Sequence, residues 1–83
     1  MTYRYKTRGT CSRAIEFELE NGVLHNVRFD GGCNGNLKGI GALVEGQRAE
    51  DVIARCDGIL CGYKSTSCPD QLAKALKEAL QNG

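Results

Sequence analysis

Hydrophobic and polar residues alternate along the first third of the chain, which is the pattern of half-buried β-strands. The clearest stretch places Ile15, Phe17 and Leu19 between glutamates, and residues 3–8 alternate in a similar way. Asn21-Gly22 follows, and it predicts a hairpin because a type I′ turn needs positive φ at both central positions. We expect the apolar face of the return strand to consist of Val23, His25, Val27 and Phe29. The pattern predicts three antiparallel strands in a meander.

The apolar spacing becomes helical after Asp30, and it predicts three helices. In the first helix, we expect four side chains to face the core: Leu37, Ile40, Leu43 and Val44. The second helix ends near Asp57-Gly58. We expect its core-facing side chains to be Ala49, Val52, Ile53 and Cys56.

The last helix has the best-defined start, with Ser67 as N-cap, Pro69 in the first turn and Asp70 where the helix dipole favours negative charge. Its apolar stripe consists of Leu72, Ala73, Leu76, Ala79 and Leu80. The whole pattern predicts one α+β domain over residues 1–83, in β-β-β-α-α-α order.

Charge adds little to this picture, because 11 basic and 10 acidic residues leave a net charge of +1. The basic residues are nevertheless unevenly placed, since four of them precede the first acidic residue, Glu16: Arg4, Lys6, Arg8 and Arg13. Such an edge would suit phosphate or nucleic acid, but we favour a solvated strand face and expect no nucleic-acid partner. Neither a signal sequence nor a long apolar run is visible, so we expect a cytoplasmic protein with no membrane partner.

Cysteine is the residue type that points to chemistry. Four of the five cysteines fall at the ends of predicted elements, close to glycines: Cys11, Cys33, Cys61 and Cys68. Thiolates on such loops can wrap a tetrahedral metal ion, and cysteines in a reducing compartment are more often metal ligands or redox groups than disulfides. The fifth, Cys56, lies on an apolar stripe and is expected in the core. His25 is expected to be a partly buried strand residue rather than a ligand.

The spacing of the cysteines leaves alternatives open. The intervals of 21, 27 and six residues contain no C-x-x-C pair, so buried free thiols remain an alternative to a metal site. Cys68 stands at a predicted helix N-terminus, which stabilises a thiolate, and Cys61 is near it in the chain, so a thiol–disulfide relay is a second hypothesis. A nucleotide- or nucleic-acid-binding module is a third, although residues 31–39 have neither phosphate-loop nor dinucleotide-binding spacing. No catalytic constellation is visible.

The segment Thr66-Ser67-Cys68-Pro69-Asp70 matches the motif that names the TSCPD domain. Nearly the whole chain resembles the small four-cysteine bacterial members of that family, in the segments Gly9-Thr10-Cys11-Ser12, Gly31-Gly32-Cys33-Asn34-Gly35 and Leu60-Cys61-Gly62. The resemblance implies a relationship to a C-terminal domain of adenosylcobalamin-dependent ribonucleotide reductases. It also implies that the four cysteines are metal ligands. Our leading hypothesis is a closed four-thiolate site that holds zinc as the first candidate and an iron–sulfur cluster as the second.

The same resemblance bears on partners and activity. It makes a ribonucleotide reductase the protein partner to test first, while a homodimer stays open. We expect no reductase activity from the chain alone, because 83 residues are too few for the catalytic barrel. An enzymatic role, if there is one, would be that of an oxidoreductase related to ribonucleoside-diphosphate reductase.

The order of elements is also similar to that of NifU/IscU-type iron–sulfur scaffolds. Cys11, Cys33 and Cys68 would then be the three scaffold cysteines, with Cys61 additional. Scaffolds of that type carry an aspartate after the first cysteine and a histidine near the last, where this chain has Ser12 and Ser67. A fourth thiolate in their place favours a closed site over one that transfers a cluster.

Overall fold

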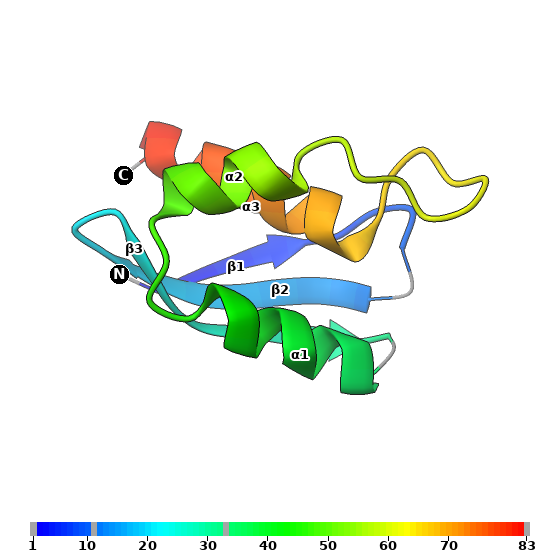
Figure 1. Cartoon of the computed structure of the whole chain (residues 1–83), viewed down its shortest axis with the longest axis horizontal. Coiled ribbons are helices and arrows are strands. Elements are labelled where there is room, and N and C mark those ends of the chain that lie inside the picture. Colours follow the sequence, from blue (N-terminus) through cyan, green and yellow to red (C-terminus); the bar gives the residue numbers. More distant parts are fainter. Residues whose placement is uncertain (1, 11, 33, 83) are drawn as a thin grey trace.

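The computed structural model describes residues 2–10, 12–32 and 34–82, and its elements follow the predicted order (Figure 1). The strands are β1 (Thr2–Lys6), β2 (Ser12–Glu20) and β3 (Val23–Gly31). The helices are α1 (Asn34–Val44), α2 (Ala49–Cys56) and α3 (Cys68–Asn82). The predicted α+β class and the β-β-β-α-α-α order are therefore confirmed.

The three strands form one antiparallel sheet in the order β1-β2-β3. The predicted hairpin turn joins β2 to β3, with φ of 54° at Asn21 and 77° at Gly22, values that a type I′ turn requires. One face of the sheet carries Ile15 and Phe17, which are almost fully buried. Tyr3 on β1 stacks on Phe17 with ring centroids 5.4 Å apart.

The helices pack on this sheet and on each other, and they close the core (Figure 1). α2 lies beside α3, and α1 lies along β3. Leu72 and Leu76 of α3 are fully buried against the strand residues. α1 approaches β3 closely at Gly41, where an added Cβ would lie 2.9 Å from the carbonyl oxygen of Val27. The close approach explains a glycine that is unfavourable for helix formation by itself.

The predicted apolar face of β3 is wrong in its first half. Leu24, not His25, is fully buried, and it pairs with Leu19 across the sheet. The register between β2 and β3 shifts between Glu16 and Glu18, beside Asn26, whose φ is 54°. Such a bulge exchanges the two faces of the strand, so strict alternation could not be continued through it.

Two helical predictions also need correction, while others are confirmed. Leu43 is 79% exposed rather than inward, and Leu80 is 41% exposed. On α2, Ala49 and Val52 are buried and Cys56 packs against the core, as predicted. Within the ranges described, no helix has both the length and the apolar character that crossing a bilayer requires.

Candidate functional site

The four predicted ligands are described in part. Cys68 opens α3 and is buried, with 8% of its surface exposed. Cys61 is an exposed free thiol in the connection between α2 and α3. Cys11 and Cys33 lie outside the described residues, so their place in a metal site stays a prediction. Cys56 is a partly buried free thiol on α2, and burial raises the pKa of that thiol.

The Cys68 sulfur lies against the start of β2. Its Sγ atom is 3.3 Å from the hydroxyl oxygen of Ser12, in a buried contact. The register of β2 shifts between Ser12 and Ala14, which turns Ser12 towards α3, whereas strict alternation would put it on the face of Glu16. Thr7 Oγ1 also donates to the Ser12 carbonyl oxygen at 2.6 Å. The Ser12 hydroxyl itself has a second contact, with Thr10 Oγ1 at 3.1 Å, and lies beside the sulfur.

Sequence neighbours of the other two cysteines meet at the same end of the sheet. Ser12 directly follows Cys11, and Gly31 is two residues before Cys33. Ser12 and Gly31 are partners in the β2–β3 register. Three segments that are far apart in the sequence thus converge beside the first turn of α3.

Cys61 is tied to the start of α3 through its backbone. The Cys61 amide donates to the carbonyl oxygen of Thr66 at 3.2 Å, and the Lys64 amide donates to the Cys61 carbonyl at 3.0 Å. Gly62 supplies the turn between them, with a φ of 57° that favours glycine. These two hydrogen bonds close the loop. They hold the backbone of Cys61 against Thr66, which is two residues before Cys68.

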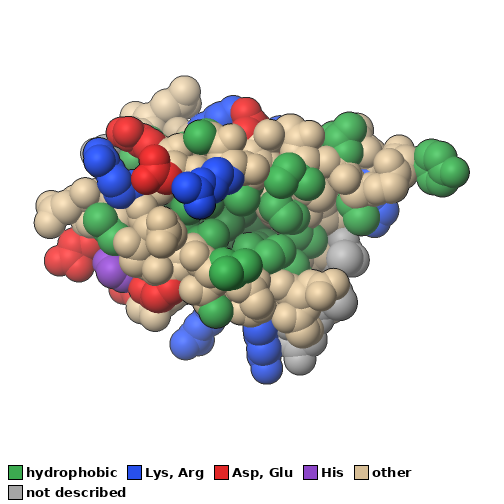
Figure 2. All heavy atoms as spheres, viewed as in Figure 1, with side chains coloured by type: hydrophobic (Ala, Val, Ile, Leu, Met, Phe, Trp, Pro, Cys, Tyr) green, Lys and Arg blue, Asp and Glu red, His purple; other side chains and the backbone are tan. Residues whose placement is uncertain are grey.

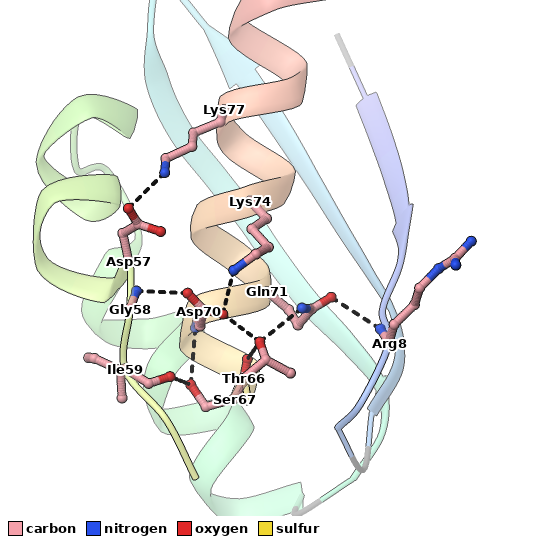
Figure 3. A network of polar contacts seen from close by, with 10 residues as sticks. All are labelled: Arg8, Asp57, Gly58, Ile59, Thr66, Ser67, Asp70, Gln71, Lys74 and Lys77. Atoms are coloured by element: carbon pink, nitrogen blue, oxygen red, sulfur yellow. Dashed lines mark hydrogen bonds and ion pairs between the residues drawn. The ribbon is translucent and has the colours of Figure 1, made fainter. Parts of the chain in front are cut away.

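The motif residues on either side of Cys68 hydrogen-bond the connection between α2 and α3 to the start of α3 (Figure 3). Ser67 Oγ accepts a hydrogen bond from the Asp70 amide at 3.1 Å, which confirms the predicted N-cap. The same hydroxyl donates to the Ile59 carbonyl oxygen at 2.5 Å. One side chain thus fixes both the first turn of α3 and the loop in front of Cys61.

Asp70 is the centre of this network (Figure 3). Its carboxylate is 1% exposed and accepts from the Gly58 amide at 2.7 Å, from Thr66 Oγ1 and from Lys74 Nζ at 2.6 Å. Hydrogen bonds from Lys74 and Thr66 lower the pKa of Asp70 to about 2, against the opposing effect of burial. The carboxylate is therefore ionised at neutral pH and holds the loop to the helix.

Gln71 extends the network to the segment after β1. Its side-chain amide donates to Thr66 Oγ1 at 2.9 Å, and its oxygen accepts from the Arg8 backbone amide at 3.1 Å. The sequence patterns did not indicate a role for Ser12 or Gln71, and they indicated Asp70 only through its effect on the helix dipole. The S-x-x-D spacing from Ser67 to Asp70 was the available signal, because it is typical of a capped helix start.

Two of the four basic residues at the N-terminal edge, Arg4 and Arg13, form ion pairs on the exposed face of the sheet. Arg4 pairs with Glu16 and, at 3.3 Å, with Asp30, and Arg13 pairs with Asp30 at 3.0 Å. Hydrogen bonding from Arg13 leads the effects that lower the pKa of Asp30. Carboxylates on the same face pair with both guanidinium groups, so Arg4 and Arg13 do not form a positive patch of unpaired charge.

The predicted partly buried His25 is confirmed, with its Nδ1 atom 2.8 Å from a Glu45 carboxylate oxygen. Within residues 2–10, 12–32 and 34–82, no group of three or more His, Cys, Asp or Glu side chains is arranged to hold a metal ion. Of the four predicted ligands, the structure describes Cys61 and Cys68, both as free thiols. A four-thiolate site would require Cys11 and Cys33 as well.

The family model of the TSCPD domain matches residues 1–80 of this chain. This match covers nearly the whole chain and confirms the resemblance carried by residues 66–70. No curated protein and no solved structure matches the chain. The similarity to NifU/IscU-type scaffolds is not shown and rests on the order of elements alone.

Proposed function

We propose that this chain, which belongs to the TSCPD domain family, is a small metal-binding protein with a four-thiolate site. Its ligands would be Cys11, Cys33, Cys61 and Cys68. The observation that carries the proposal is the meeting of Ser12, Gly31 and Cys68 at one end of the sheet. Two of these residues are sequence neighbours of the first two cysteines, and Cys61 is tied by its backbone to Thr66.

The chemistry of these donors fits zinc first and an iron–sulfur cluster second. Zinc prefers four tetrahedral ligands in closed structural sites, and thiolates are common among them. Four thiolates around Zn²⁺ carry a net charge of −2, which hydrogen bonds and nearby cations offset. Ser12 offers a hydroxyl to Cys68, and Lys64 and Arg13 are the basic residues nearest in sequence to Cys61 and Cys11.

The role of such a site is first of all to stabilise the fold. A structural zinc ion contributes about 10–16 kcal/mol in small metal-dependent domains, whereas a domain of this size has roughly 4–12 kcal/mol in total. A metal that joins β2, the end of β3 and the start of α3 would therefore dominate the stability. We expect a strong chelator to unfold the protein.

The test is metal analysis and absorption spectroscopy of protein purified without oxygen. We expect close to one zinc ion per chain, or the visible absorption of an iron–sulfur cluster. Cys68→Ala and Cys61→Ala should each lower metal content or affinity by about tenfold or more. Cys56→Ala is the matched control, because this thiol packs against the core on α2, and it should keep its metal.

Two results would refute the proposal. One is protein that holds neither zinc nor iron when prepared under these conditions. The other is a Cys56→Ala variant that loses as much metal as Cys68→Ala while both stay folded by circular dichroism.

A thiol–disulfide relay through Cys61 and Cys68 is the second candidate, and the exposure of Cys61 supports it. It predicts a reversible disulfide between these two residues, measurable by mass spectrometry across a series of redox buffers. Thiols that resist oxidation while metal is bound would exclude it.

In either form we place the protein in the cytoplasm as an accessory to a ribonucleotide reductase, and a pull-down with that enzyme as bait would test the association.

A further inference from the structure

The outer edge of β3 runs beside α1 and leaves a groove between the two elements. β3 is an edge strand, because the strands of the sheet follow the order β1-β2-β3. A cavity of about 370 Å³ lies at this edge. Its lining combines apolar and basic side chains: Val27, Arg28, Phe29, Gly31, Leu37 and Lys38. We call this cavity the β3-edge groove.

The hydrogen-bond pattern of the sheet decides where the backbone of Phe29 points. Thr7 and Arg13 form a hydrogen-bonded pair, since the Thr7 amide donates to the Arg13 carbonyl oxygen at 3.1 Å. Such pairs alternate along antiparallel strands, so the next one joins Tyr5 to Ile15. The backbone N–H and C=O of Ile15 therefore point towards β1. Phe29 faces Ile15 in the β2–β3 register, so its own N–H and C=O point away from β2, off the edge of the sheet.

A close contact with α1 agrees with this direction. Val27 is two residues before Phe29, so the backbone groups of both residues point to the same side. The Val27 carbonyl oxygen is 2.9 Å from the position that a Cβ at Gly41 would take, which directs this oxygen towards α1. The helix thus closes the edge at Val27, and the groove lies beyond it. No described residue outside the sheet forms a hydrogen bond with the backbone of Phe29.

The charges that line the groove have one sign. Arg28 and Lys38 are exposed, and neither takes part in an ion pair within the described part of the chain. The acidic residues beside Arg28 on the outer face, Glu16 and Asp30, both pair with Arg4. Figure 2 shows basic side chains that project at the lower edge of the view, where Figure 1 places α1. The groove therefore favours an anionic occupant.

We propose that the β3-edge groove binds an extended acidic segment of a partner protein, which adds a short strand to β3. The segment residue opposite Phe29 exchanges two backbone hydrogen bonds with it. The side chain of this residue lies on the same face as the Phe29 ring, beside Leu37, where an apolar group fits. The residues on either side of it turn their side chains to the face of Arg28, where acidic groups fit. The preferred segment therefore alternates acidic and apolar residues.

Nuclear magnetic resonance of the isotope-labelled full chain, as purified, tests the proposal. The probe is a short synthetic peptide that alternates valine and glutamate and is capped at both ends. We expect saturable binding with a Kd below about 1 mM and a shift of the Phe29 amide resonance. Arg28→Gln and Lys38→Gln should each raise Kd about twofold to fivefold, the range of exposed ion pairs. Arg55→Gln is the matched control, because Arg55 is an exposed arginine outside the groove lining, and it should leave Kd unchanged.

Backbone methylation of the peptide separates strand addition from charge attraction. Methylation of the valine amides removes the donors that face β3 and should abolish binding. Methylation of the glutamate amides, which point to solvent, should leave Kd within about threefold of the unmodified peptide. Equal affinities of the two methylated peptides overturn the proposal, because the predicted strand register is then absent.

Three further results overturn it. They are the absence of binding up to about 1 mM peptide, equal binding of a peptide with lysine in place of glutamate, and an unchanged Kd in both Arg28→Gln and Lys38→Gln. None of the residues that line the groove is a proposed metal ligand. Metal content is read in the same samples, so the metal site and the groove are judged separately.

Discussion

Two aspartates in this protein make similar contacts in different surroundings. Asp70 is 1% exposed at the start of α3, and Asp30 is 43% exposed on the outer face of the sheet. Each carboxylate is paired with a basic side chain, and each has a lowered pKa. The two carboxylates differ in what else they bind. Asp70 also accepts hydrogen bonds from the Gly58 amide and from the buried Thr66 hydroxyl, whereas Asp30 pairs with the exposed side chains of Arg4 and Arg13.

An ion pair alone therefore does not set the energetic weight of a carboxylate, which depends also on the other donors that it binds inside the protein. Water competes with an exposed pair and screens it, so such pairs contribute about 0–1 kcal/mol. Removing a buried acceptor leaves each of its donors unsatisfied, at about 1–3 kcal/mol per donor. The stability of the loop around Cys61 should therefore depend on Asp70, and that of the sheet hardly at all on Asp30.

The largest effect is expected for Asp70→Ala, which leaves the Gly58 amide and the Thr66 hydroxyl without their acceptor. We expect a loss of about 3 kcal/mol in the free energy of unfolding. Urea denaturation followed by circular dichroism measures it. Asp30→Ala is the control, and an equal loss in both variants would contradict the comparison.

Acid should reveal the same difference. Because the folded pKa of Asp70 is about 2 and its ordinary value is 3.8, its contribution is complete above the ordinary value and is lost as pH falls through about 2. The stability advantage of the wild type over Asp70→Asn should therefore shrink by roughly 2 kcal/mol between about pH 5 and pH 2. Both proteins keep the same cysteines, so any release of metal in acid affects both and cancels in the difference between them. A constant difference across this range would be inconsistent with the assigned role.

A smaller effect is expected for Ser67→Ala, which removes the N-cap of α3 and the hydrogen bond to Ile59. We expect a loss of about 1 kcal/mol. Thermal and urea unfolding measure it, and Ser67→Asp, which can still cap the helix, should recover part of the loss. No recovery would mean that the bond to Ile59 is the more important of the two.

The smallest effect is expected on the outer face of the sheet. Arg13→Ala removes one partner of Asp30 but leaves Arg4, and we expect a change below about 0.5 kcal/mol that disappears at high salt. Urea denaturation at low and high salt checks this. A loss above 1 kcal/mol would show that the exposed network contributes more than its solvent exposure implies.

The capped start of α3 could be read from the sequence, because it is a local pattern, but the contacts around Cys68 could not. The four-cysteine site itself stays a prediction. Ser12 could not be identified, because its contact with Cys68 depends on a register shift in β2. The burial of Asp70 likewise depends on the loop around Gly58 folding back over α3.

The sequence by itself determined the order of the strands and helices, the Asn21-Gly22 turn and the N-cap at Ser67, since these features depend on residues within a few positions of one another. The tertiary structure decided which face each strand residue takes after a bulge, as Leu24 shows, and where α1 touches β3, as Gly41 shows. It also decided that the segments next to Cys11, Cys33 and Cys68 meet. Such contacts join residues far apart in the chain, and alternation or spacing along the sequence carries no information about them.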